Sequence, residues 1–145
     1  MSISQTTTTS FRVELLQAVH NFDSDTFKIA LYTGAADIGP NTTVYTTIGE
    51  ASGTNYTAGG NTLTVSTTPT YGTNSYNVVT AYVSFANTSW NNASFTARGA
   101  LIYNSSKSNK SVAVLDFGAD KTVPAGTFTV QFPTADANSA IVRIS

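Results

Sequence analysis

Short segments in which apolar residues occupy every second position make up most of this chain, and only one segment has helical spacing. Residues 27–32 show the strand pattern clearly, because Phe27, Ile29 and Leu31 share one face and predict a half-buried strand. Residues 10–22 instead place apolar side chains on one helical face; we expect this helix to begin at Ser10 as N-cap and to end near Asn21–Asp25. Because no helical segment separates the later strands, the pattern excludes an α/β fold and predicts antiparallel sheets.

The spacing of these segments predicts about eight strands. We expect them at residues 27–32, 42–47, 63–65, 78–86, 95–103, 112–117, 128–132 and 140–144. Turn-forming residues predict loops at 49–60, 67–77, 105–111 and 118–126, and Gly99 marks a bulge or a close contact inside its strand. The predicted fold class is mainly β: an antiparallel β-sandwich of the jelly-roll type with one short N-terminal helix, although the same strands could close as a barrel.

The length of 145 residues is that of one domain. Residues 1–9 are polar and low in complexity, so we predict a flexible N-terminal arm followed by a single β-sandwich domain at 10–145. The absence of cysteine excludes disulfides and thiolate metal sites. No segment approaches the roughly 20 apolar residues of a membrane helix, and the N-terminus lacks an export pattern. We therefore expect a protein that folds where it is made and does not enter a membrane.

Charged residues are scarce, at 10% of the chain with a net charge of −1. Threonine, serine and asparagine take their place and give a neutral polar surface that suits β-strands. The seven lysines and arginines are spread singly rather than clustered. Nucleic-acid binding requires clustered positive charge, so this class of partner is not expected.

The residues that catalysis needs are also scarce. His20 is the one histidine, and it lies in the segment His20–Asp25, which also holds Asn21 and Asp23. This cluster allows two interpretations: a metal or proton site, or a turn in which Asp and Asn bond their own backbone, and we favour the turn. The other carboxylates are well separated in the sequence. We therefore predict no catalytic, cofactor-binding or metal-binding residues, no cofactor, and a protein that is not an enzyme.

Two carboxylates stand in segments where a structural role is expected. Asp116 lies in the apolar run 112–117, so it either faces outward or pairs with Arg98 or Arg143 on a neighbouring strand, and we favour the pairing. Glu50 opens the glycine-rich segment 49–60, where its carboxylate can accept backbone N–H groups.

Four aromatic residues lie in polar, loop-like stretches: Tyr56, Tyr71, Tyr76 and Trp90. Exposed tyrosine and tryptophan side chains form sugar-binding platforms and protein interfaces. Packing over the mouth of the sandwich is the alternative for each of them. The residues that bind a partner are not predicted individually.

Several stretches together resemble small virion proteins of tailed bacteriophages. They are Thr26–Ile38, Gly53–Thr64, Phe95–Ser106 and Ala113–Pro133, and the helix that precedes them fits the same pattern. The resemblance covers nearly all of the chain after residue 10. It implies a structural component of the virion, similar to capsid decoration or cement proteins.

This resemblance implies a protein that binds the outer surface of the major capsid protein as a homotrimer or homodimer, after assembly in the host cytoplasm. We expect the sheet edges and the arm Met1–Thr9 to make the contacts, since strand addition and ordering of an arm are general recognition modes. The alternative is a tail-associated or receptor-binding module that recognises surface carbohydrate through Trp90 and Tyr71. An enzyme is the third and weakest hypothesis.

Overall fold

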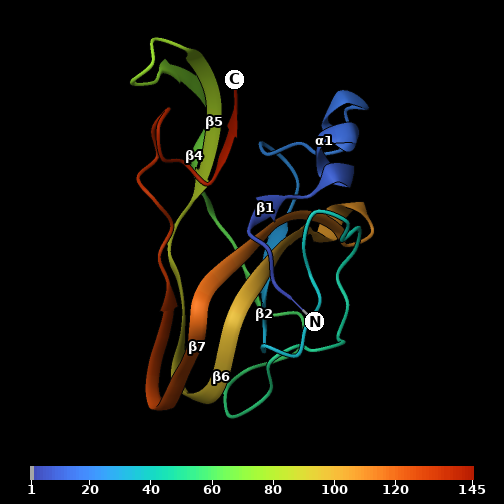
Figure 1. The fold of residues 1–145 in the computed structure, drawn as a ribbon, viewed down its shortest axis with the longest axis vertical. Helices are drawn as coiled ribbons and strands as arrows, with labels where there is room; N and C mark the ends of the chain where they lie inside the picture. The colour runs from blue at the N-terminus through green and yellow to red at the C-terminus, as the bar shows by residue number, and fades with distance from the viewer. Residues whose placement is uncertain (1) are drawn as a thin grey trace.

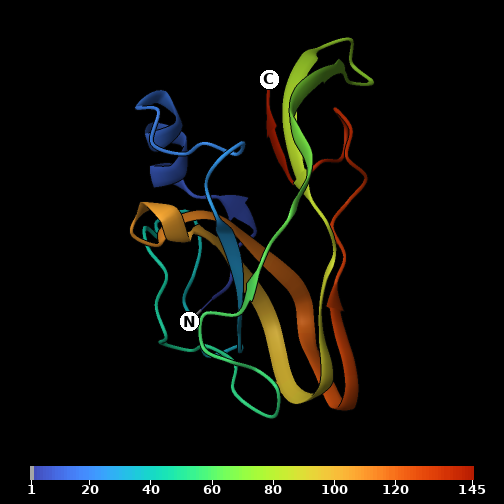
Figure 2. The ribbon, with the colours of Figure 1, turned by 180° about the vertical axis from the view of Figure 1, so that it is seen from behind.

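A computed structural model describes residues 2–145, with half of the residues in strands. The strands form two antiparallel sheets, and a single short α-helix stands beside them near the N-terminus (Figures 1 and 2). The strands are β1 (Thr6–Thr7), β2 (Phe27–Tyr32), β3 (Asn61–Thr62), β4 (Val65–Thr73), β5 (Val79–Phe85), β6 (Thr88–Asn104), β7 (Lys110–Val130) and β8 (Val142–Ile144); the helices are α1 (Thr9–Leu16) and the short 3-10 helix η1 (Ser105–Lys107).

The larger sheet has the strand order β1-β7-β6-β2-β3, and the smaller has the order β4-β5-β8. Every pair of named strands is antiparallel, and the pairs β4–β5 and β6–β7 are hairpins. The predicted antiparallel β-sandwich with one N-terminal helix is confirmed. These strand orders do not establish a jelly roll, which stays a prediction.

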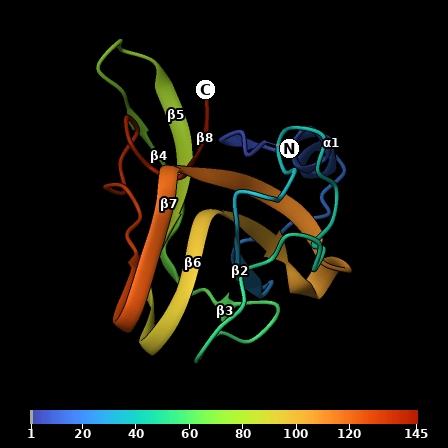
Figure 3. The same ribbon diagram turned by 60° about the horizontal axis from the view of Figure 1, so that its bottom comes forward.

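The hairpin of β6 and β7 is much longer than the sequence pattern indicates. Both strands turn back together at the end of the molecule opposite the C-terminus (Figures 1 and 3). Register shifts next to Trp90, Ala93 and Ala97 mark the bulges that allow paired strands to bend. The predicted loop at 118–126 is therefore wrong, since Pro124 and Gly126 belong to the bend of a continuous strand.

Gly99 lies at one of these irregularities, as predicted. A β-carbon at this position would come within 2.6 Å of the Leu115 carbonyl oxygen and 2.8 Å of Ile3. The glycine therefore permits the N-terminal segment to approach β6 and β7 closely.

The segment predicted as a flexible arm lies against the larger sheet in residues 2–9. Ile3 forms a parallel bridge to Ile38, and β1 pairs with β7 through Thr6 and Val114. Thr8 is fully buried, and its hydroxyl lies 2.8 Å from that of Ser111. Threonine is β-branched and fits an edge strand, which explains why a polar run takes this place.

Helix α1 is shorter than its apolar spacing indicates, and its N-cap is Thr8 rather than Ser10. The Thr8 hydroxyl accepts a hydrogen bond from the Phe11 N–H at 3.3 Å. The helix ends at Leu16, because Ala18 adopts a left-handed conformation with φ of 57°. Phe11 and Phe22 still reach the core, but Phe22 does so from the loop after the helix.

Strand β2 is buried on both faces, so its prediction as a half-buried strand is wrong. Phe27, Ile29 and Leu31 face the main core between the layers. Ala30 and Tyr32 face a second cluster, which Ile38 and Leu101 also join and which lies beneath the loop after β2. Alternation alone indicated one buried face because alanine and tyrosine occur on either side of a sheet.

Two predictions between β2 and β5 are wrong: one expected strand is a loop, and one expected loop is mostly strand. The expected strand 42–47 contributes only a bridge between Val44 and Lys110. The expected loop 67–77 is largely strand β4, whose register on β5 shifts on both sides of Thr67. Pro69 and Gly72 are accommodated because β4 is an irregular edge strand.

Candidate functional site

The β4–β5 hairpin and β8 form a small sheet that projects from the body of the molecule (Figures 1 and 2). The register places Tyr71, Ala81 and Ile144 side by side, with Val79 next along the same face. Towards the body this face continues into Val83 and Val142, which are buried in the main core. One apolar face therefore begins in the core and runs out along the projecting strands.

The outer half of this face is uncovered. Tyr71 is 74% exposed, Val79 is 61% exposed and Ile144 is 54% exposed, and Ala81 between them is also exposed. None of these residues carries a charge. We call the surface formed by Tyr71, Val79, Ala81 and Ile144 the apolar sheet face. Contiguous exposed apolar patches of this kind mark interaction sites.

The opposite face of the small sheet is covered by the chain itself. Thr80 and Ser84 point to that side and are buried. Ala137 lies 3.5 Å from the position a β-carbon would take on Gly72, and Asn138 accepts a hydrogen bond from the Ser75 N–H. The loop before β8 therefore forms the second layer there, and the apolar sheet face is the side left without one.

The tip of the β4–β5 hairpin is held by one asparagine. The Asn74 side-chain oxygen accepts hydrogen bonds from the N–H groups of Tyr76 and Val78 at 2.9 and 3.0 Å. Asn77 has φ of 60°, a conformation that asparagine tolerates in tight turns. This turn presents the Tyr76 side chain, which is 85% exposed.

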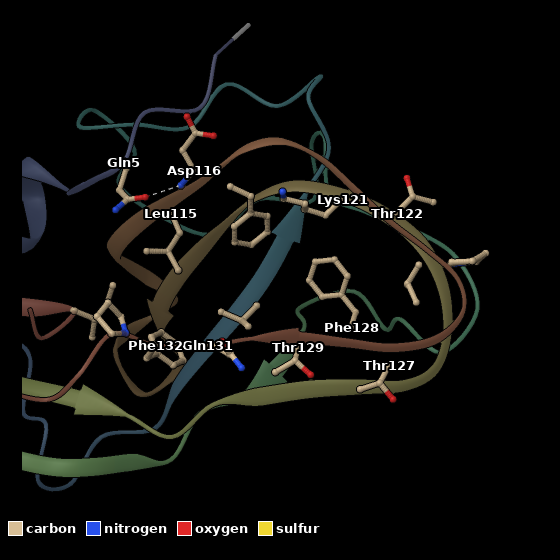
Figure 4. A pocket seen from close by; sticks show the side chains of 16 residues that line it. Gln5, Leu115, Asp116, Lys121, Thr122, Thr127, Phe128, Thr129, Gln131 and Phe132 are labelled. Carbon is tan, nitrogen blue, oxygen red and sulfur yellow. Dashed lines mark hydrogen bonds between the residues drawn. The ribbon is translucent and has the colours of Figure 1, made fainter.

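A second apolar feature lies inside the bend of β7. The two arms of this strand face one another across an open pocket of about 550 Å³ (Figure 4). Leu115, Phe128 and Phe132 point into it. The remaining lining residues are Gln5, Asp116, Phe117, Lys121, Thr122, Val123, Pro124, Thr127, Thr129, Val130, Gln131, Pro133 and Ile141. The floor is aromatic and aliphatic, and the polar groups lie at the rim.

The His20–Asp25 segment forms a hydrogen-bonded network rather than an open site. The His20 side chain is fully buried; its Nε2 atom lies 2.9 Å from Glu14 and its Nδ1 atom 3.0 Å from the amide of Asn104. That amide also donates to Asp25 at 2.8 Å, and Asp23 donates its N–H to the Asn21 side chain. This arrangement supports the turn interpretation, with Asn104 of β6 as a partner that the local sequence did not reveal.

The Asp25 carboxylate is stabilised by its surroundings. Burial alone would raise its pKa, but hydrogen bonds from Asn104 and from the Asn21 N–H, with Lys107 and His20 nearby, lower the pKa below its usual value. The network thus ties the chain after α1 to the β6–β7 hairpin through a charged acceptor.

Glu50 gathers the glycine-rich loop around its carboxylate, as predicted. The Gly59 N–H donates to it at 2.8 Å, and the hydroxyls of Tyr45 and Tyr56 each donate at 2.7 Å. The Tyr103 hydroxyl donates to the Gly59 carbonyl beside this group. Burial is the main cause that raises the pKa of Tyr103 to about 12. Burial, together with the hydrogen bond to Glu50, also raises the pKa values of Tyr45 and Tyr56.

The four aromatic residues singled out from the sequence divide into two pairs. Trp90 is 4% exposed and packs near Phe95 and Phe128 in the core, and half-buried Tyr56 packs beside it. Tyr71 and Tyr76 are exposed on the projecting hairpin. Trp90 lies inside β6, whereas the sequence pattern placed it between the expected strands 78–86 and 95–103.

Asp116 does not pair with either predicted arginine. Its side chain accepts the Gly118 N–H, and Gln5 accepts the Asp116 N–H. Arg98 instead lies 3.9 Å from Asp120, and Arg143 donates to the Asn138 carbonyl. The bend in β7 and its bulge opposite Gly99 change the cross-strand neighbours that simple alternation predicts.

The sequence did not identify either apolar surface as such. Tyr71 was predicted in a loop and Val79 in a strand. Only the pairing of β4, β5 and β8 puts them on one face. The pocket depends on the bend, which joins residues on two arms of one strand. The lack of charged residues between positions 71 and 79 is the one feature of the local sequence that could have indicated the apolar sheet face.

Within residues 2–145, no group of three His, Asp or Glu side chains is placed to hold a metal ion. No helix in this part of the chain is long and apolar enough to cross a membrane. Comparison with protein-family models, with curated proteins and with solved structures found no match.

Proposed function

We propose that this chain is a structural protein of the virion of a tailed bacteriophage, and specifically a capsid decoration protein. It binds the outer surface of the major capsid protein and stabilises the head. The resemblance of its core segments to small phage virion proteins supports this function. The observation that carries the proposal is the apolar sheet face, which continues the core but has no covering layer.

The chemistry of this face suits a protein partner. A sheet buries its apolar side against a second layer, and here the outer half lacks one within the chain. Tyr71 offers a large apolar ring with a polar tip, as interface residues do. The uncharged surface can lie against another protein with little cost of removing charges from water.

Docking through this face would act by mass action. A protein that binds only the assembled, expanded lattice stabilises that lattice in proportion to the free energy of binding. Residues 2–9, within the arm expected to make such contacts, already lie against the protein itself: Thr6 and Thr7 pair with β7, and Ile3 bridges to Ile38. The projecting sheet therefore replaces the arm as the proposed contact element.

The alternative function, carbohydrate recognition by a tail-associated module, now depends on Tyr71 and Tyr76. Trp90 is buried and is withdrawn from that proposal. The Asn74 side-chain oxygen already accepts two backbone N–H groups, so it is not a free hydrogen-bonding group beside these rings. Sugar platforms need such groups next to the aromatic surface, so this observation favours the protein partner.

The test is co-sedimentation with empty expanded capsids assembled from the major capsid protein encoded with this chain, in parallel with host cells. Ile144→Thr should weaken capsid binding by about tenfold, because it places a hydroxyl in a buried apolar contact. Ile48→Thr makes the same change at an exposed residue outside the face, and it should bind as the wild type does.

The outcomes separate the two functions. Binding to capsids but not to cells, weakened only by Ile144→Thr, supports decoration. Binding to cells that a soluble glycan blocks would overturn it in favour of receptor recognition. Equal loss with both variants would show that the apolar sheet face is not the contact.

A further inference from the structure

We propose that Tyr76 of one copy inserts into the β7 pocket of a second copy, so that the protein self-associates head to tail. This contact involves neither Ile144 nor the other members of the apolar sheet face, and it stands independently of what the protein decorates. The chain carries both halves of the contact: a projecting aromatic side chain and an open apolar pocket.

The backbone that presents the Tyr76 side chain, the knob of this contact, is held in place. Tyr76 is 85% exposed on a turn that Asn74 holds through two backbone N–H groups. The adjacent Ser75 N–H is anchored to Asn138, which ties the tip to the loop before β8. Little backbone freedom is lost when a turn held in this way binds, which favours association.

The pocket has the size and chemistry for this side chain. Its volume of about 550 Å³ lies within the range of ligand pockets, and Phe117, Phe128 and Phe132 supply aromatic surface. Aromatic rings favour edge-to-face and offset contacts with one another. Gln5 and Gln131 at the rim can pair with the tyrosine hydroxyl.

Charge does not oppose the contact. The segment from Tyr71 to Val79 contains no charged residue. At the pocket rim, Asp116 and Lys121 carry opposite charges, and no carboxylate in residues 2–145 forms an ion pair with Lys121. A neutral tip therefore meets a rim of zero net charge, with no like charges opposed.

The two halves cannot meet within one copy. The hairpin tip lies at one end of the molecule, near the C-terminus, and the bend of β7 lies at the other (Figure 1). A knob and a pocket on different surfaces make a heterologous contact, which joins each copy to the next rather than pairing identical surfaces. This geometry differs from a two-fold dimer and can be tested directly.

The absence of cysteine makes site-directed cross-linking clean. We would place one cysteine beside the knob, Ser75→Cys, and one at the pocket rim, Lys121→Cys, in separate preparations. The two are mixed and treated with a short-spacer bismaleimide, and intact mass identifies the products. Head-to-tail contact predicts a Ser75→Cys to Lys121→Cys heterodimer in large excess over both homodimers.

The control removes the knob but keeps the cysteine. Adding Tyr76→Ser to Ser75→Cys should lower heterodimer yield by about tenfold or more, because burial of the ring drives the contact. Circular dichroism verifies that each variant folds. A second control, Ile48→Cys mixed with Lys121→Cys, should give only background cross-linking.

Homodimers in excess, or a heterodimer yield that Tyr76→Ser leaves unchanged, would overturn the proposal. Capsid binding by wild-type protein would be unaffected by that result, so the two proposals fail separately.

Discussion

Apolar side chains are buried in the body of the molecule, whereas similar side chains are exposed on the projecting β4-β5-β8 sheet. In the body, Phe27 and Ile102 are buried, and the polar groups that accompany them are paired, as His20 is with Glu14. In the projecting sheet, Tyr71 and Val79 face solvent on a surface that continues the core. The difference teaches that the body buries its apolar area within the chain, whereas the projection leaves apolar area exposed.

The largest loss of stability is expected from a cavity in the core of the body. Phe27→Ala removes a ring that is 1% exposed and stacks on Phe22 with centroids 4.5 Å apart. We expect the free energy of unfolding to fall by about 3–5 kcal/mol, the usual cost of such a cavity. Urea unfolding followed by circular dichroism measures it. Tyr76→Ala at the hairpin tip removes an aromatic side chain of similar size and should change stability by no more than about 0.5 kcal/mol.

Glu50→Ala should give the next largest effect. It leaves the Gly59 N–H and the Tyr45 and Tyr56 hydroxyls without their acceptor. We expect a loss of about 1–3 kcal/mol, the cost of polar groups left unpaired on burial. Glu50→Gln keeps one acceptor oxygen and should lose less. Equal losses for the two variants in the same unfolding assay would show that the hydrogen bonds contribute little.

Alkaline pH should weaken the same region. The pKa of Tyr103 in the folded protein is raised from 10.0 to about 12. The folded state therefore keeps protons that the unfolded state releases, so stability is full below pH 10 and falls as pH rises towards 12. Unfolding at a series of pH values, with tyrosinate absorbance, measures the slope. Tyr103→Phe should make the slope shallower, and an unchanged slope would contradict this assignment.

The smallest stability effect is expected on the projection. Tyr71→Ser replaces a ring that is largely in water, so the free energy of unfolding should change by no more than about 0.5 kcal/mol. The same variant should reduce binding to expanded capsids, which co-sedimentation measures. A loss of stability comparable to that of Phe27→Ala would mean that this face is covered within the folded chain.

Sequence reasoning succeeded where the signal is local. Strand β2, the polar turn at Ser105–Lys107 and the acceptor role of Glu50 follow from alternation and turn chemistry over a few residues. It failed where a distant segment decides the outcome. Trp90 was placed outside a strand, although β6 already pairs with β7 at Thr88. The end of the helix at Leu16 was also missed, but there the cause is local, the left-handed conformation of Ala18.

The candidate surfaces could be predicted only in part. Tyr71 and Tyr76 were recognised as aromatic residues in neutral surroundings, and both are exposed. Tyr56 and Trp90 had the same local signal but are drawn into the core by neighbours distant in the sequence, including Phe128. Local composition cannot separate these cases, because burial depends on which strands are paired.

The sequence by itself determined the strand-rich class, the single N-terminal helix and the neutral surface, because these depend on residue type and short-range period. Only the tertiary structure decided that Thr6–Thr7 pair with β7, that β6 and β7 bend as one hairpin, and that one sheet face stays uncovered. Each of these depends on pairing between residues far apart in the chain, where bulges reset the register and so the face that each side chain takes.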